Sequence, residues 1–150
     1  MIAREPLHVL VGLIGDERGR WLVNQRRAGT PLAGFWEFPG GKLEVGETPL
    51  EALRRELGEE LGIEVASAEP WLELVHDYPD KRVRLDVWRV LDYRGVVTAR
   101  EAQRLDWVPA DRLAGLPLLP ADLPIVAALR GEWEAPADFS RSRAGSARPD

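Results

Sequence analysis

Three glutamates, Glu56, Glu59 and Glu60, lie within five residues of one another in the segment RRELGEELG. Glu56 and Glu60 stand four positions apart, a spacing at which like charges on a helix repel each other by roughly 0.2–0.5 kcal/mol. Either the neighbouring arginines, Arg54 and Arg55, or a bound cation must offset this repulsion. Carboxylate oxygens and a free backbone carbonyl are the ligands that Mg²⁺ selects, usually together with water molecules and substrate phosphates.

The segment that carries these glutamates predicts an amphipathic helix. Thr48 and Glu51 have the spacing of a capping box, with proline at the first helical position, and Gly62 follows the last apolar residue of the pattern. At 100° per residue, Arg55 and the three glutamates fall on one contiguous polar face. The predicted buried stripe consists of Leu50, Leu53, Leu57 and Leu61. Most polar helix faces of this kind are simply solvated, and this alternative stays open on the helix alone.

The residues before the helix favour a ligand site over a solvated face. In FWEFPGGK, the residues Pro39, Gly40 and Gly41 interrupt any regular element and indicate a sharp turn. A glycine backbone can approach a ligand closely because it has no side chain. Glu47 lies just before the helix cap and adds another carboxylate near the same end.

The whole stretch GKLEVGETPLEALRRELGEELGI is similar to the Nudix box, Gly-x5-Glu-x7-Arg-Glu-aliphatic-x-Glu-Glu-x-Gly-aliphatic, and agrees with it at every fixed position. These positions are Gly41, Glu47, Arg55, Glu56, Leu57, Glu59, Glu60, Gly62 and Ile63. On this basis the chain is identified as a member of the Nudix hydrolase superfamily. The resemblance implies an α/β fold, an α/β/α sandwich with a mixed β-sheet between helices.

The resemblance also implies a function, the metal-dependent hydrolysis of a nucleoside diphosphate linked to another moiety. It implies Mg²⁺ as the cofactor, with Mn²⁺ able to substitute. Glu56 is then the candidate base for the attacking water, Arg55 orients the glutamates, and Glu47 holds the loop. The metal ligands implied are the Gly40 carbonyl, Glu56, Glu59, Glu60 and, as described next, Glu101.

Four further segments, WEFPGGK, YPDK, AREAQ…DWV and LLPADLPIV, resemble the MutT-type branch of the family over residues 7–129. Enzymes of this branch convert 8-oxo-dGTP to the monophosphate and pyrophosphate, with attack at the β-phosphorus. In this branch a glutamate at the position of Glu101 can complete the metal site, although a glutamate in a loop is more often only a surface residue.

The same resemblance implies the residues that contact the substrate. It places Arg26 and Phe38 at the border of the base pocket, with Gly41, Lys42 and Asp122 also in contact with the substrate. Arg26 and Phe38 have an ordinary alternative, a surface arginine at a strand end and an aromatic side chain of the core.

Asp122 is a departure from the MutT pattern, because many bacterial MutT proteins have asparagine there. An ionised aspartate only accepts hydrogen bonds, from the N–H groups of 8-oxoguanine or from the amino group of cytosine, whereas burial without a partner would let it donate. Aspartate also occurs here in relatives that hydrolyse cytidine triphosphates, so CTP, dCTP or a 5-substituted pyrimidine nucleotide is the alternative substrate. A further alternative is that Asp122 only caps the closing helix.

A non-catalytic nucleotide-binding module is less compatible with an intact box.

The remaining sequence predicts the strands that support this site. The runs HVLVGLI and RWLVNQR predict two strands joined as a hairpin around GDERG, and two β-rich runs flank the turn YPDK. Val83, Leu85 and Val87 alternate with polar residues that include Asp86, as in a half-buried strand. The run LDWVP predicts a further strand, and residues 121–130 predict a short closing helix.

Composition limits the class of protein. A chain of 150 residues fits one domain, which we place at residues 1–130, followed by a flexible C-terminal tail at residues 131–150. The absence of cysteine excludes disulfides and thiolate metal sites and agrees with a reducing compartment. The formal net charge of -5 argues against long nucleic acid as a partner. We expect a cytoplasmic monomer or homodimer with a small nucleotide substrate, and neither a signal peptide nor a membrane span.

Overall fold

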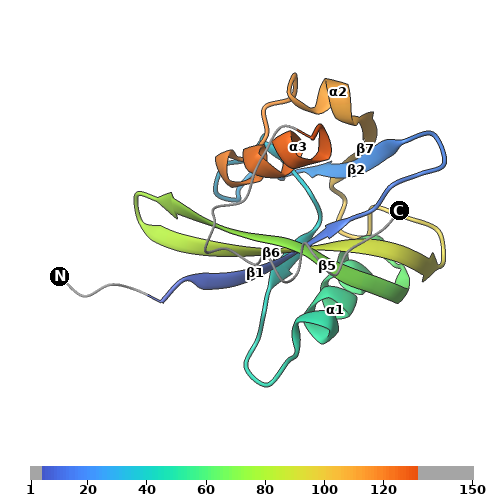
Figure 1. Ribbon diagram of the computed structural model, residues 1–150, viewed down its shortest axis with the longest axis horizontal. Coiled ribbons are helices and arrows are strands. Elements are labelled where there is room, and N and C mark those ends of the chain that lie inside the picture. Colours follow the sequence, from blue (N-terminus) through green and yellow to red (C-terminus); the bar gives the residue numbers. More distant parts are fainter. Residues whose placement is uncertain (1–4, 132–150) are drawn as a thin grey trace.

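The computed structural model describes residues 5–131, and the strands of this part of the chain form two sheets (Figure 1). The first sheet has the order β4-β1-β6-β5, and it is mixed because β1 and β6 run parallel while the other pairs are antiparallel. The second sheet, β3-β2-β7, is antiparallel. The strands are β1 (Leu7–Leu13), β2 (Arg20–Gln25), β3 (Trp36–Glu37), β4 (Gly40–Lys42), β5 (Glu64–Tyr78), β6 (Lys81–Arg94) and β7 (Arg104–Pro109). The helices are α1 (Pro49–Leu61), α2 (Ala110–Leu113), the short 3₁₀ helix η1 (Pro120–Asp122) and α3 (Leu123–Leu129).

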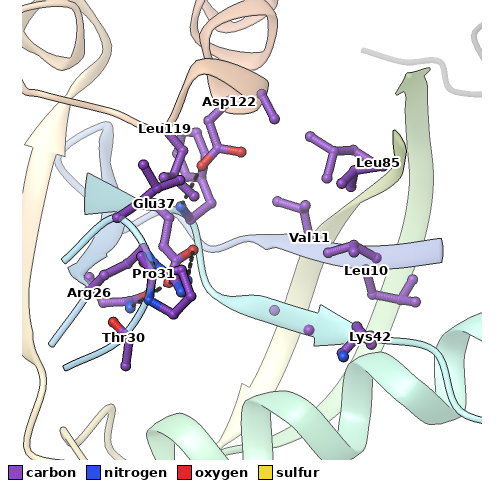
Figure 2. Close-up of a pocket in the computed structure, with 18 of the residues that line it drawn as sticks. Leu10, Val11, Arg26, Thr30, Pro31, Glu37, Lys42, Leu85, Leu119 and Asp122 are labelled. Atoms are coloured by element: carbon purple, nitrogen blue, oxygen red, sulfur yellow. Dashed lines mark hydrogen bonds and ion pairs between the residues drawn. The ribbon is translucent and has the colours of Figure 1, made fainter. Parts of the chain in front are cut away.

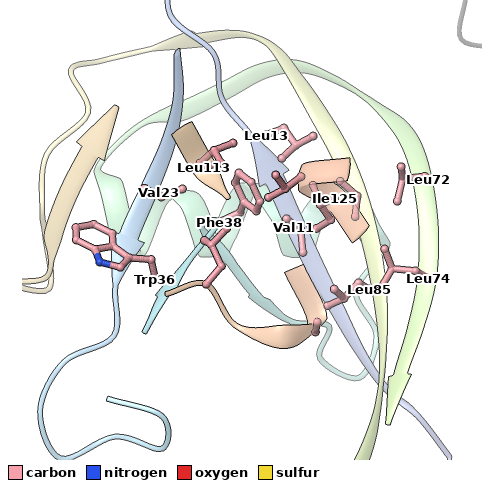
Figure 3. Close-up of a cluster of buried hydrophobic side chains, with 14 of the residues drawn as sticks. Val11, Leu13, Val23, Trp36, Phe38, Leu72, Leu74, Leu85, Leu113 and Ile125 are labelled. Carbon is pink, nitrogen blue, oxygen red and sulfur yellow. The ribbon is translucent and has the colours of Figure 1, made fainter. Parts of the chain in front are cut away.

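Helices cover both faces of the mixed sheet, with α1 on one side and α3 on the other (Figure 1). Strand β1 shows how the two cores arise, because its side chains alternate between the faces. Leu10 packs in a cluster with the leucines of α1, whereas Val11 and Leu13 pack in a second cluster with Ile125 of α3 (Figure 3). This arrangement confirms the predicted α/β/α sandwich with a mixed sheet between helices.

Helix α1 has the predicted boundaries because its caps are encoded locally. The Thr48 side chain accepts a hydrogen bond from the Glu51 N–H, and the Glu51 carboxylate accepts one from the Thr48 N–H at 2.8 Å. Gly62 ends the helix in the left-handed conformation with φ 71°, which favours glycine. Leu53, Leu57 and Leu61 are fully buried, and each side chain contributes about 1.5–3 kcal/mol to folding. Leu50, predicted to belong to the same buried stripe, is only partly buried because it lies in the first turn of the helix. The polar face of α1 is thereby held at a fixed rotation relative to the sheet.

The predicted hairpin of the first two strands is wrong, although both strands exist. β1 and β2 belong to different sheets, although their connection turns back on itself. At that turn there is an isolated bridge between Gly15 and Trp21, and the Leu22 and Asp16 N–H groups donate to the Ile14 and Arg20 carbonyls at 3.0 and 2.9 Å. The physical reason is that β4 and β6 occupy both edges of β1. The alternation of apolar residues identifies a strand but does not identify its partner.

The hairpin around YPDK is confirmed, since Tyr78 pairs with Lys81 across the turn. Along β6, Val83, Leu85 and Val87 are buried as predicted. Asp86, which the alternation assigned to a polar outer face, is instead only 2% exposed. It accepts hydrogen bonds from the His8 Nε2 and the Trp88 Nε1, both at 2.9 Å. The prediction failed there because β6 is an interior strand whose two faces are both covered.

The closing helix is formed by η1, which begins at Pro120, one residue before the predicted range, and by α3, which lies within that range. Gly131 is the last described residue, so the remainder of the tail predicted at residues 131–150 lies outside the described part of the chain. Within residues 5–131, no helix has the length and apolar character needed to cross a membrane.

Candidate active site

A cavity of about 400 Å³ opens between the mixed sheet, the glycine turn and η1 (Figure 2). Strand β4 brings Gly40, Gly41 and Lys42 to one end, while η1 brings Asp122 to the other end. The predicted site residues that line the cavity are Arg26, Phe38, Gly40, Gly41, Lys42, Glu60, Glu101 and Asp122. The other four, Glu47, Arg55, Glu56 and Glu59, do not line it and meet in a network of ion pairs beside it.

Arg55 is the centre of this network. Its Nε and Nη2 donate to the two oxygens of Glu47 at 2.6 and 2.9 Å, and its Nη1 donates to Glu56 Oε2 at 3.0 Å. Its Nη2 also donates to the Lys42 carbonyl at 3.0 Å, which attaches the helix to β4. The bidentate contact lowers the pKa of Glu47 to about 2 and raises the pKa of Arg55. Arg55 thus fixes the orientation of Glu47 and Glu56.

The glycine turn is packed directly against the glutamates of α1. A Cβ atom at Gly41 would overlap the Glu56 carboxylate, and one at Gly40 would overlap the carbonyl oxygen of Leu10. Gly40 has φ 151°, and its N–H donates to Glu60 Oε1 at 3.4 Å. Only glycine fits at Gly40, where the overlap is with backbone, whereas a side chain at Gly41 would displace the Glu56 carboxylate.

Glu60 has a strongly perturbed environment. Burial raises its pKa, and the adjacent Glu56 carboxylate and the negative charge of Glu101 raise it further. Like charges gathered in a partly dry site favour either a proton or a cation between them. Glu101 lies in the loop between β6 and β7 and lines the cavity.

The donor set fits a hard divalent cation, although its side chains are not gathered around one. Within residues 5–131, no group of three or more His, Cys, Asp or Glu side chains is placed to hold a metal ion as it stands. The Glu59 side chain is 56% exposed and points toward Arg55, with 3.7 Å between Oε1 and Nη1. Even so, the side-chain donors are all carboxylate oxygens, which suit Mg²⁺, and a cation would relieve the crowding at Glu60.

The opposite end of the cavity has a buried acid of different character. Asp122 is 4% exposed, and its Oδ2 accepts a hydrogen bond from the Phe38 N–H at 3.2 Å. Burial, together with the nearby Glu37 charge, raises the pKa of Asp122 to about 8. Asp122 precedes α3 but makes no side-chain capping bond to it. The alternative that Asp122 only caps the closing helix is therefore wrong.

Two polar residues at this end, Glu37 and Asn24, were not predicted from the sequence. Arg26 Nη1 donates to both oxygens of Glu37 at 3.2 and 3.3 Å, and Arg26 Nε donates to the Pro31 carbonyl at 2.6 Å (Figure 2). Burial raises the pKa of Glu37, whereas Arg26 acts against that shift. Asn24 donates weakly to Glu37 at 3.5 Å, and its buried Oδ1 has no partner among the described residues. The feature of the sequence that could have indicated Glu37 is its place between two aromatic residues, in WEF.

The chain was compared with known proteins. Residues 10–128 match the family described as the NUDIX domain. The chain is 39% identical to an 8-oxo-dGTP diphosphatase of Proteus vulgaris over 67% of this chain and 90% of that protein. It is also 39% identical to a CTP pyrophosphohydrolase of Escherichia coli, over 79% of this chain and 88% of that protein.

Among solved structures, the solution structure of the Escherichia coli ORF135 protein is similar to this fold. It is 36% identical, with a TM-score of 0.75 over 85% of this chain and 90% of that chain. The sequence match, the shared fold and the arrangement of the box glutamates around Arg55 and the glycine turn agree with one another. This chain belongs to the NUDIX domain family.

Proposed function

We propose that the chain is a Mg²⁺-dependent nucleoside triphosphate pyrophosphohydrolase of the MutT type that converts 8-oxo-dGTP to 8-oxo-dGMP and pyrophosphate. One observation carries the proposal: a single cavity has crowded carboxylates at one end and the buried Asp122 beside the Phe38 N–H at the other. Such a cavity suits a ligand with a polyphosphate and a base. The similarity to an 8-oxo-dGTP diphosphatase supports the choice of substrate. The activity would remove an oxidised nucleotide before DNA synthesis uses it.

Asp122 is suited to read the edge of an oxidised purine. With a pKa of about 8, most of its carboxyl groups are protonated at neutral pH. A protonated carboxyl both donates and accepts hydrogen bonds, as the amide of asparagine does. It can therefore donate to the O6 atom of 8-oxoguanine and accept from its N7–H. The departure from the asparagine of many MutT proteins is compatible with the same substrate.

At the phosphate end, the chain's own residues hold the reacting groups. Glu56 accepts the proton of the attacking water, and Arg55 keeps the Glu56 carboxylate in place through the 3.0 Å contact. The new bond forms between the water oxygen and the β-phosphorus, and the bond from that phosphorus to the α–β bridging oxygen breaks. Lys42, beside the glycine turn of Gly41, lines the cavity and adds a positive charge for the phosphates.

Mg²⁺, or Mn²⁺ in its place, supplies neutralisation of phosphate charge and a lowered pKa of bound water. The Gly40 carbonyl and the glutamate carboxylates are the groups that would hold it. These carboxylates belong to Glu56, Glu59, Glu60 and Glu101.

The alternative substrate is CTP, dCTP or a 5-substituted pyrimidine nucleotide. The similarity to a CTP pyrophosphohydrolase favours it, and Glu37 together with the ionised form of Asp122 would accept from the amino group of cytosine. The test is kcat/KM measured with Mg²⁺ for 8-oxo-dGTP, dGTP, CTP, dCTP and 5-methyl-dCTP. We expect 8-oxo-dGTP to be preferred. A tenfold or greater preference for cytosine nucleotides would refute the first substrate, and no hydrolysis of any nucleotide with Mg²⁺ or Mn²⁺ would indicate a non-catalytic binding module.

A further inference from the structure

We propose that Gln103 is a positioning residue that fastens the loop of Glu101 to the end of α1, so that the Glu101 carboxylate is held beside Glu60. The inference deepens the proposed function and rests on it, because Glu101 has a position to keep only if it is a metal ligand.

Both ends of the Gln103 amide are engaged. Its Oε1 accepts a hydrogen bond from the backbone N–H of Glu101 at 2.9 Å, and its Nε2 donates to the backbone carbonyl of Glu60 at 3.0 Å. The side chain is 7% exposed, so water competes little for either bond. A planar amide thereby links two proposed ligands that lie far apart in the sequence.

The end of α1 gives this link a rigid anchor. The carbonyls of the last helical turn have no partner within the helix. Here the loop that leads to Glu101 provides partners, since the Thr98 N–H donates to the Leu61 carbonyl at 2.9 Å and the Arg100 N–H donates to the Glu60 carbonyl at 3.0 Å. Gln103 is the side chain that adds a second bond to the Glu60 carbonyl.

The backbone between Glu101 and Gln103 is strained. Ala102 has φ 61°, in the left-handed region that non-glycine residues rarely adopt. Such a conformation costs free energy and persists only where its surroundings hold it. The bond from the Glu101 N–H to Gln103 Oε1 spans Ala102, and the bond from Gln103 to the Glu60 carbonyl attaches this turn to α1.

The link through Gln103 has a functional consequence because it keeps the Glu60 and Glu101 carboxylates close together against their electrostatic repulsion. Glu60 and Glu101 both line the cavity, and two carboxylates brought together there repel each other unless a cation lies between them. Gln103 holds the loop in place with a neutral group, which adds no charge to the cation site. The carboxylate is therefore already in position when a cation arrives, and less binding free energy is spent on ordering the loop.

The decisive variant is Gln103→Met, which keeps the length of the side chain and removes both hydrogen bonds. Mn²⁺ binding to the full-length protein without nucleotide, measured by electron paramagnetic resonance, should weaken by about tenfold, the lower range for losing a group that orients a metal ligand. The Mg²⁺ concentration for half-maximal activity should rise, whereas KM for the nucleotide at saturating Mg²⁺ should stay within about twofold. If the Met variant does not fold, Gln103→Asn, which is too short to span both partners, is expected to give the same loss.

Two comparisons separate positioning from a merely structural role. Val108→Ala, a core truncation in strand β7, which begins directly after Gln103, should lower the melting temperature without changing Mn²⁺ affinity. In a Glu101→Gln background, Gln103→Met should weaken Mn²⁺ binding no further, because the residue that it positions has lost its charge. Unchanged Mn²⁺ affinity in Gln103→Met, or a full additional loss in the double variant, would overturn the proposal.

Measurements on the wild-type chain and on the same variants also test the proposed function separately from the role of Gln103. If Glu101→Gln alone left Mn²⁺ binding unchanged, Glu101 would not be a ligand and the inference would be overturned. If the Mn²⁺ cycle behaved as expected but the wild-type chain hydrolysed none of the nucleotides, the function would be refuted while the role of Gln103 would be supported.

Discussion

The ion-pair network beside one end of the cavity and the buried acid at its other end contain acidic side chains with opposite protonation behaviour. Beside the end near α1, the bidentate Arg55 lowers the pKa of Glu47 to about 2. At the end near η1, burial and the charge of Glu37 raise the pKa of Asp122 to about 8. Asp122 has one hydrogen bond from a backbone N–H to offset its burial, and no arginine contact is found for it within residues 5–131.

The contrast teaches that residue type alone does not determine what a carboxyl group does in this site. An arginine partner keeps a carboxylate charged and suited to a cation, whereas burial away from water lets a carboxyl keep its proton and donate a hydrogen bond to a base. Glu60 does not follow this division, since burial and the adjacent Glu56 carboxylate raise its pKa although it lies among the proposed metal ligands. The predictions below test whether the two ends differ in this way.

The largest effect is expected for Glu56→Gln at the metal end. The amide cannot accept the proton of the attacking water, so kcat should fall by at least about 100-fold, the lower range for loss of a general base. Circular dichroism and the melting temperature check that the fold is kept. Glu17→Gln, the same change at an exposed turn residue, is the control and should leave kcat unchanged. Near-wild-type turnover by Glu56→Gln would remove Glu56 from the role of base.

Glu59→Gln should act on the cation instead of on the proton. Glu59 is the most exposed glutamate of the Arg55 network apart from Glu44, so its loss disturbs the fold little. We expect the Mg²⁺ concentration for half-maximal activity to rise by about tenfold, with partial recovery of kcat at high Mg²⁺. A titration of activity against Mg²⁺ measures this. Unchanged metal dependence would show that Glu59 is not a ligand.

At the base end, substitutions of Asp122 should have smaller effects that depend on what replaces the carboxyl. Asp122→Ala removes a hydrogen bond to the base and should lower kcat/KM for 8-oxo-dGTP by about fivefold, which corresponds to about 1 kcal/mol. Asp122→Asn keeps a donor and an acceptor, so its kcat/KM at pH 7 should stay within about twofold of wild type. If Asp122→Asn were as impaired as Asp122→Ala, the protonated carboxyl would not be the group that reads the base.

The same contrast explains how much of the site was predictable from sequence. The grouping of Glu56, Glu59 and Glu60 was predictable because they lie on one helix, where spacing fixes which side chains share a face. Gly40 and Glu101 lie outside that helix, and only the family resemblance assigned them to the same site. The capping residues Thr48 and Glu51 and the stop at Gly62 are also local signals, and the structure has all three.

The base end could not be derived in this way, because it is assembled from distant segments. Asp122 meets Phe38 across 84 positions of sequence, and only the family resemblance pointed to the pair. Glu37 and Asn24 were missed since their burial depends on how β2 and β3 pair. The wrong partner for β1 and the misjudged exposure of Asp86 have the same cause, because strand pairing is set by tertiary contacts.

The smallest effect concerns stability, and its sign follows from the raised pKa of Asp122. In the unfolded chain this carboxyl loses its proton near pH 4, whereas in the folded chain it keeps the proton until about pH 8. Between about pH 4 and pH 8 the folded state therefore binds more protons than the unfolded state. The contribution of Asp122 to the free energy of unfolding is complete below about pH 4 and declines as the pH rises to about 8.

Urea denaturation at pH 5 and at pH 8.5 measures this contribution when wild type is compared with Asp122→Asn. Glu37 and Glu60 also have raised pKa values, but they are present in both proteins and their contributions largely cancel. Wild type should lose at least about 1 kcal/mol more than the Asn variant between the two pH values, the equivalent of somewhat less than one pKa unit. Equal losses would mean that Asp122 is ionised at neutral pH. The two ends would then be electrostatically alike, and an acceptor-only Asp122 would favour a cytosine nucleotide over 8-oxo-dGTP.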